Sequence, residues 1–134
     1  MGYVGGDVKL IEINHEILGS KKIFPKAGEE ATLNRGGVVT TDDAANRTAA
    51  GQLISIKSEE NGSFEVLCAN DNVDNREAKF CRQLMASSVL SDVVITYISG
   101  AVIGGKAEPV GTIAESSNAT FTLKLAFDGE INDL

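Results

Sequence analysis

A glycine-rich segment contains the residues that come closest to a nucleotide-binding motif. Gly100, Gly105 and Lys106 have the G-x-x-x-x-G-K spacing of a phosphate-binding loop. Such a loop also needs a hydroxyl side chain after the lysine to hold magnesium, and a helix N-terminus that faces the phosphates. Here Ala107 follows the lysine, and no helical pattern begins after it. We therefore expect a hairpin turn at Gly100 and a bend or bulge at Gly104 and Gly105, without nucleotide binding.

The remaining reactive residue types form no recognisable site. His15 is the only histidine, so it would have to serve in any Ser-His-Asp relay or histidine-rich metal site. It follows an expected strand in apolar surroundings, which favours a structural or surface role. Three acidic pairs, Glu29–Glu30, Asp42–Asp43 and Glu59–Glu60, occupy expected turns or loops and are typical of a solvated surface. The sequence DDAAN, which begins at Asp42, has too few ligands for an EF-hand loop.

No catalytic residue, cofactor or metal site is thus predicted, and we expect that the protein is not an enzyme.

The charge balance of the chain argues against a protein that binds nucleic acid tightly. Nineteen acidic against twelve basic residues give a net charge of −7, whereas proteins that grip nucleic acid concentrate lysine and arginine. The same charge suits a surface past which nucleic acid slides without binding. No apolar run reaches the roughly 18 residues of a membrane-spanning helix, so stable membrane insertion is not expected.

The two cysteines, Cys68 and Cys81, lack the spacing of metal ligands. The pattern favours two buried free thiols. A disulfide within or between subunits stays open as the alternative, because an extracellular particle is an oxidising setting.

Apolar alternation predicts mostly β structure. A strand is expected over residues 7–14, and a hairpin over residues 52–68 with a positive-φ turn at Asn61–Gly62. Residues 92–99 are apolar on both faces, which is typical of a strand buried between layers.

The last expected strand, residues 119–127, alternates strictly between apolar and polar positions. Its apolar positions should face the core. Its other face presents Thr120, Thr122 and Lys124 to solvent or to a lumen.

One helix is expected after Asp74, which would cap it together with Glu77 in a capping box. Val73 and Ala78 have the spacing of a hydrophobic staple. Four residues at helical spacing should face the core: Phe80, Cys81, Leu84 and Met85.

Residues 19–51 are rich in glycine and small polar residues and show no extended apolar pattern. A structureless loop of this length in a compact domain indicates a function or a partner. We therefore expect an arm that becomes ordered against another subunit, and the alternative is a mobile surface loop. Its expected apolar anchors are Ile23, Phe24, Leu33, Val38 and Val39. Deletion of residues 20–50 would then leave a folded domain that cannot stack.

Three segments, in this order, resemble the tail tube proteins of contractile-tailed bacteriophages. Residues 23–44, IFPKAGEEATLNRGGVVTTDDA, are similar to that family's long arm. Residues 63–77 are similar to its strand-to-helix junction. In residues 104–131, G-K-x-x-P-V-G precedes A-T-F-T-L-K-L, as in its C-terminal strand pair. The two cysteines are not part of the family's pattern.

The resemblance implies a single domain over residues 1–134: a mainly β barrel or sandwich flanked by one helix, with an inter-subunit arm at about 19–51. It implies a virion protein, assembled in the host cytoplasm, that stacks as hexameric rings into the inner tail tube. Sheath, baseplate and tail-terminator proteins would be its partners, and DNA would pass through the lumen without specific binding during contractile ejection.

Two other functions stay open. One is the tube of a phage-like injection machine or type VI secretion system, which shares the architecture but carries another cargo. The other is a stand-alone β-barrel binding module, which the absence of tryptophan and the presence of only two tyrosines disfavour.

Overall fold

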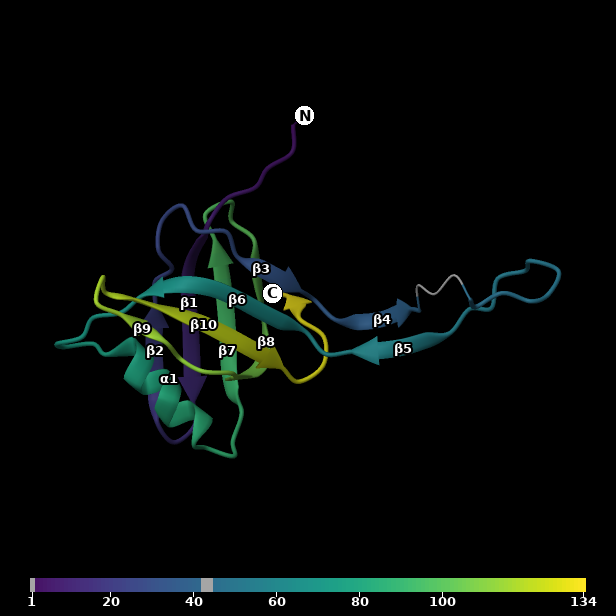
Figure 1. The fold of residues 1–134 in the computed structure, drawn as a ribbon. Helices are drawn as coiled ribbons and strands as arrows, with labels where there is room; N and C mark the ends of the chain where they lie inside the picture. The colour runs from purple at the N-terminus through teal and green to yellow at the C-terminus, as the bar shows by residue number, and fades with distance from the viewer. Residues whose placement is uncertain (1, 42–44) are drawn as a thin grey trace.

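The computed structural model describes residues 2–41 and 45–134, which form eleven strands and one helix (Figure 1). In chain order the elements are β1 (Val8–His15), β2 (Gly19–Ile23), β3 (Thr32–Asn34), β4 (Gly37–Thr40), β5 (Lys57–Glu60), β6 (Ser63–Ala69), α1 (Glu77–Met85), β7 (Ser91–Tyr97), β8 (Val102–Pro109), β9 (Glu115–Ser116), β10 (Thr120–Phe127) and β11 (Asn132–Asp133). The prediction of a mainly β fold with one flanking helix and an extended arm is confirmed.

Nine strands form one antiparallel sheet with the main order β2-β1-β7-β8-β10-β6-β3, while β4 and β5 pair separately in the arm. The main sheet is strongly curved, because residues of β1, β7, β6, β10 and α1 belong to one buried cluster. It is not a fully closed barrel, since β2 and β3 end the order without pairing to each other. The segment after β2 instead bonds to β6: Lys26 N–H donates to Leu67 O over 3.0 Å, and Ala69 N–H donates to Phe24 O over 2.8 Å.

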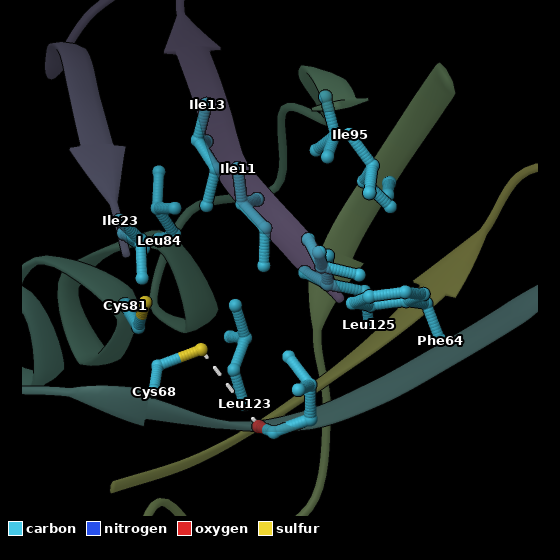
Figure 2. Close-up of a cluster of buried hydrophobic side chains, with 14 of the residues drawn as sticks. Ile11, Ile13, Ile23, Phe64, Cys68, Cys81, Leu84, Ile95, Leu123 and Leu125 are labelled. Atoms are coloured by element: carbon cyan, nitrogen blue, oxygen red, sulfur yellow. Dashed lines mark hydrogen bonds between the residues drawn. The ribbon is translucent and has the colours of Figure 1, made fainter. Parts of the chain in front are cut away.

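The core follows from the register of its strands (Figure 2). On β10 and β6, Leu123 lies opposite Val66 and Leu125 opposite Phe64. These side chains point to the same face and are buried. The alternation predicted for residues 119–127 is therefore confirmed from Phe121 onward. Ala119 differs: it is exposed and adopts a φ of 60° in the turn before β10.

Strand β7 confirms the expected strand at residues 92–99, but only one of its faces is buried. Val93 and Ile95 are buried against β1, whereas Val94 is half-buried and Ile98 is exposed. Its second face therefore has no layer over it within the described residues.

The hairpin predicted for residues 52–68 is wrong, although β6 itself is present. Strand β5 pairs with β4, and β6 pairs with β10 and β3. Gly62 connects the arm to the sheet without a positive φ. It is buried, and a Cβ there would lie 2.5 Å from Ile131 Cγ1, so a side chain has no room.

The nucleotide-motif residues lie in a β hairpin, as expected. Gly100 turns the chain between β7 and β8 with a φ of 97°. The bulge expected at Gly104 and Gly105 is wrong, because β7 and β8 stay in register from Ser91 to Thr96. Gly104 is needed for close approach instead: a Cβ there would lie 2.4 Å from Val93 O.

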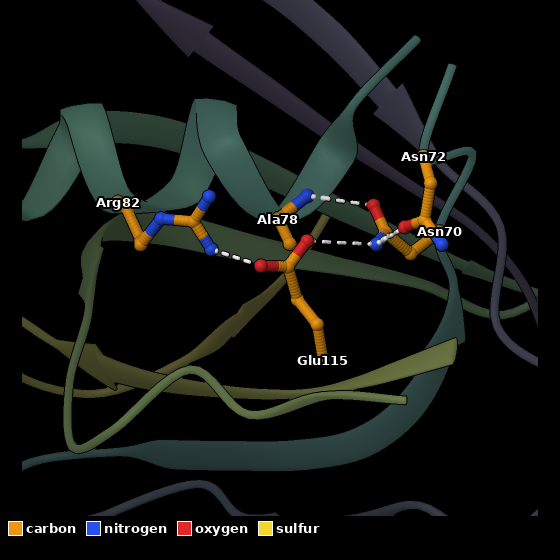
Figure 3. A network of polar contacts seen from close by, with 5 residues as sticks. All are labelled: Asn70, Asn72, Ala78, Arg82 and Glu115. Carbon is orange, nitrogen blue, oxygen red and sulfur yellow. Dashed lines mark hydrogen bonds and ion pairs between the residues drawn. The ribbon is translucent and has the colours of Figure 1, made fainter. Parts of the chain in front are cut away.

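The N-terminus of α1 is held by residues outside the helix (Figure 3). The helix begins at Glu77, and Asp74 makes no cap, so the predicted capping box and staple are wrong; Val73 is 75% exposed. Asn70 Oδ1 accepts a hydrogen bond from Ala78 N–H over 3.2 Å, and Glu77 Oε2 accepts one from Asp71 N–H over 2.7 Å. Asn70 thereby satisfies one of the N–H groups that a helix start leaves free, while Glu77, the first residue of the helix, fixes the loop before it.

The same network ties β9 to the helix. Asn70 Nδ2 donates to Glu115 Oε1 over 3.0 Å, and Arg82 forms an ion pair of 2.6 Å with Glu115 Oε2. The bonds from Arg82 and Asn70 lower the pKa of Glu115. On the buried stripe, Phe80, Cys81 and Leu84 are confirmed, whereas Met85 is 40% exposed because it lies in the last turn of the helix.

Asn70→Ala is expected to lower the free energy of unfolding by about 1–3 kcal/mol, because it leaves the buried Ala78 N–H without an acceptor. Chemical denaturation followed by circular dichroism measures the change. Asn118→Ala, at an exposed turn position, is the control and should have little effect. Equal stability of the two variants would contradict this account of the helix start.

Candidate assembly interface

The most prominent surface feature is a hairpin that projects from the body, here called the arm and comprising residues 36–61 (Figure 1). Strands β4 and β5 pair from Gly37–Glu60 to Thr40–Lys57. Thr41 N–H donates to Ile56 O over 2.8 Å and continues the pairing. The arm is therefore a paired hairpin rather than an unstructured loop.

The arm begins later than the predicted residue 19, because β2 and β3 belong to the main sheet. Of the expected anchors, Ile23 is fully buried in the core, and Leu33 on β3 packs against it. Phe24 lies on the body and is 54% exposed. Only Val38, 66% exposed, and the half-buried Val39 lie on the arm, in β4.

Sequence reasoning missed three apolar residues of the arm. Leu53, Ile54 and Ile56 precede β5 and are 61%, 44% and 47% exposed. The alternation of Ile54, Ser55 and Ile56 is the available signal, but the sequence pattern places it in a hairpin with residues 63–68. Contiguous exposed apolar side chains on a soluble protein indicate a surface that a partner covers.

The tip of the arm is a tight turn. Gly51 N–H donates to Thr48 O over 2.9 Å, and Gly51 has a φ of 85°. Arg47 and Leu53 lie opposite each other just behind this turn. A cationic and an apolar side chain are thereby presented together at the end of the arm.

The base of the arm is fixed to the C-terminal segment. Gly36 has a φ of 73°, and a Cβ there would lie 2.5 Å from Glu60 O, so only glycine fits. Ile131 N–H donates to Arg35 O over 2.9 Å, and Gly62 N–H donates to Gly129 O over 2.7 Å. These backbone bonds on both limbs set the direction in which the arm leaves the body.

The polar face of β10 is accessible. Thr120 and Thr122 are half-buried, and Lys124 is exposed opposite Glu65 of β6. Such a face can border either solvent or the lumen of an assembly. The assignment of Thr120, Thr122 and Lys124 to a lumen therefore stays a prediction.

His15 has a structural role. Its Nδ1 accepts hydrogen bonds from Ile17 N–H and Leu18 N–H over 3.1 and 3.0 Å. Its Nε2 lies 3.0 Å from Ser87 Oγ and 3.2 Å from Val89 O, so the buried ring joins the β1–β2 turn to the segment after α1.

The acidic pairs do not form a site among the described residues. Glu59 and Glu60 are exposed on β5, Glu29–Glu30 lie in the loop before β3, and Asp42–Asp43, with the DDAAN cation hypothesis, lie outside the described residues. Residues 2–41 and 45–134 contain no group of three or more His, Cys, Asp or Glu that could hold a metal. They also contain no helix with the length and apolar character needed to cross a membrane.

Cys68 and Cys81 are free thiols buried between β6 and α1 (Figure 2). Burial raises the pKa of Cys68, and it raises that of Cys81 to about 12. Neither sulfur is accessible to a second copy, because both residues have an exposed fraction of 0%.

Comparison with known proteins finds similarity in structure only. No family model and no curated protein matches the sequence. Among solved structures, a chain of the tail of an empty gene transfer agent particle, determined by helical refinement with C6 symmetry, superposes with a TM-score of 0.59 at 14% identity. The match covers 94% of this chain and 95% of that one. A chain of the virion of a native gene transfer agent particle matches with a TM-score of 0.56 at 13% identity, over 92% and 95% of the two chains. The protein thus has a fold found in phage-like tail particles.

Replacing residues 38–59 by Asn-Gly is expected to leave the body folded. Gly37 and Glu60 are paired, so a two-residue turn can join them, and the shorter loop costs less closure entropy. The free energy of unfolding should stay the same or rise slightly in a denaturant titration. The expectation that deletion of residues 20–50 leaves a folded domain is wrong, because that deletion removes β2, β3 and the buried Ile23 from the body. It therefore serves as the contrast and should unfold the body. Loss of cooperative unfolding in the first variant would contradict the assignment of the arm.

Cys68 and Cys81 should resist a thiol reagent at pH 8 in the native protein, because the thiolate is the reactive species and burial disfavours it. Reaction with dithionitrobenzoate should become at least about 100-fold faster in denaturant. Rapid reaction of the native protein would show that one of the thiols is accessible.

Proposed function

We propose that this protein is the tube subunit of a phage or phage-like tail, a structural protein that stacks as hexameric rings around a lumen. The observation that carries the proposal is the match of nearly the whole chain to a tail chain refined with C6 symmetry. It agrees with the resemblance of the sequence to tail tube proteins. Both the structural match and the sequence resemblance concern the whole fold, and neither of them involves a catalytic residue.

Unsatisfied surfaces of the single chain support assembly. β2 and β3 stand at the two ends of the strand order, where a strand from a neighbour can add. The arm has few contacts with its own body beyond its base, and it exposes Val38, Leu53 and Ile54. Copies of the same chain would cover these groups and give a continuous sheet around the lumen.

The charge of the chain suits the passage of DNA. A lumen with a net negative character repels phosphate, whereas lysine-rich walls would bind it with an affinity that depends strongly on salt. With a net charge of −7, the protein is expected to let DNA pass without specific binding. In this function the protein belongs to the virion and is assembled in the host cytoplasm. Sheath, baseplate and terminator proteins would be its partners in a contractile tail.

Electron microscopy of the purified protein tests the proposal. Rings with six-fold symmetry, or tubes built from them, are expected at high protein concentration, and native mass spectrometry should detect multiples of six subunits. The variant with residues 38–59 replaced should lose the tubes. A protein that stays monomeric at millimolar concentration would refute the tube function.

A further inference from the structure

A recess of about 560 Å³ lies between the end of β2, the β6–α1 loop and the turn before β10. Its apolar lining comes from Phe24, Ala69, Val73 and Ala119. Phe24 and Val73 are 54% and 75% exposed, although both are large apolar side chains. No function described above uses this recess.

Hydrogen bonds cross-link the walls of the recess. Ala69 N–H donates to Phe24 O, and Asn70 N–H donates to Ala119 O, both over 2.8 Å. Asp71 Oδ1 accepts from Val73 N–H over 2.9 Å and holds the loop in place. A preformed surface of this kind loses little conformational freedom when it binds.

The rim of the recess carries negative charge. Asp71, which is half-buried, and Glu77 line the recess, and the exposed Asp74 lies in the same loop. Lys21, which donates to Asn75 O, is a cation beside these three carboxylates. Backbone N–H groups of Val73 and Asp74 lower the pKa of Asp71, so its carboxylate is ionised at neutral pH. An apolar ligand with an adjacent cation would complement this surface.

The tip of the arm has that composition. Leu53 and Ile54 are exposed there, and Arg47 lies directly opposite Leu53. Arg47 Nη1 makes a hydrogen bond of 3.4 Å to Gly51 O, and the guanidinium has no carboxylate partner among the residues that the structure describes. The tip and the recess therefore match in both polarity and charge.

The arm of one molecule does not lie near its own recess. In Figure 1 the arm projects from one end of the body, while α1 and the loop before it lie at the opposite end. A contact between the tip and the recess therefore joins two copies. Such a contact uses different surfaces on the two partners, so each copy that receives an arm still has its own arm to offer to a further copy. Repetition of the contact can therefore extend an assembly beyond two copies, as stacking in a tube requires.

We propose that the arm tip of one copy, with Leu53, Ile54 and Arg47, docks in the Phe24–Val73 recess of a second copy. The proposal rests on the proposed function in that it names the surface that receives the arm in the tube. It assigns Phe24, predicted from sequence to be an arm anchor, to the receiving side.

Mixed single-cysteine variants test the contact. Leu53→Cys and Val73→Cys, made in separate chains, replace exposed residues, and the two native thiols are buried. Under mild oxidation of the mixture at assembling concentration, we expect the heterodimer between the two variants to exceed either homodimer by at least about tenfold. A dominant Leu53→Cys homodimer would show that arms contact each other and would overturn the proposal.

Substitution in the recess supplies a second readout. Val73→Asp should prevent tubes at concentrations about tenfold above those at which the wild type forms them, because it places a carboxylate in the apolar wall on which Leu53 and Ile54 would pack. Ile17→Asp, at a side chain 73% exposed in the β1–β2 turn, is the matched control and should stack normally.

The outcomes separate this proposal from the tube function. If the wild type forms tubes but the mixed variants give no heterodimer, the arm docks elsewhere and only the proposed contact is wrong. If the wild type does not assemble and the mixed variants do not cross-link, both are wrong. Normal tubes from Val73→Asp would also overturn the contact.

Discussion

The pairing of β6 with β10 is the constraint on which the other parts of the structure depend. The register that places Leu123 opposite Val66 puts the apolar side chains of both strands into the core. A slip by one residue would turn every one of them to the opposite face. Both ends of β6 also lead into neighbouring parts of the structure. Gly62 connects β6 to the arm, and Asn70, just beyond β6, accepts the hydrogen bond from Ala78 N–H and lines the recess. The position of the arm and that of its proposed receptor are thus set by one strand.

The strands with strict alternation could be predicted from the sequence, because burial of one face dictates the pattern. Residues 121–127 are an example, and the helical stripe of Phe80, Cys81 and Leu84 is another. The strand expected at residues 7–14 is also present, although its pairing with β7 shifts register between Val8 and Leu10. The helix start could not be predicted by local rules. Asp74 has the right spacing for a cap, but Asn70 reaches the helix through the fold of the β6–α1 loop. Only tertiary structure brings that acceptor to Ala78.

The strands of the arm, like the helix start, could not be predicted from local sequence patterns. Its limbs β4 and β5 are separated by 16 residues in sequence, from Thr40 to Lys57, and β5 reads KSEE, which has little strand propensity. Composition alone predicted an arm in this part of the chain but not its bounds. Ile23 illustrates the difference: it is next to the exposed Phe24 in sequence, yet it is fully buried because β2 pairs with β1. The sequence alone therefore does not distinguish the apolar residues that are exposed on the arm and the body from those in the core. The fold is needed to tell them apart.

The burial of the thiols of Cys68 and Cys81 has a consequence for the stability of any assembly of this chain. In the proposed function, the protein would be made in a reducing cell and would afterwards persist outside it, in an oxidising environment. With Cys68 and Cys81 shielded by β6 and α1, neither environment can form or break a sulfur bond between neighbouring subunits. A polymer of this chain would be held by reversible contacts alone, and its cohesion would respond to salt and temperature but not to oxygen.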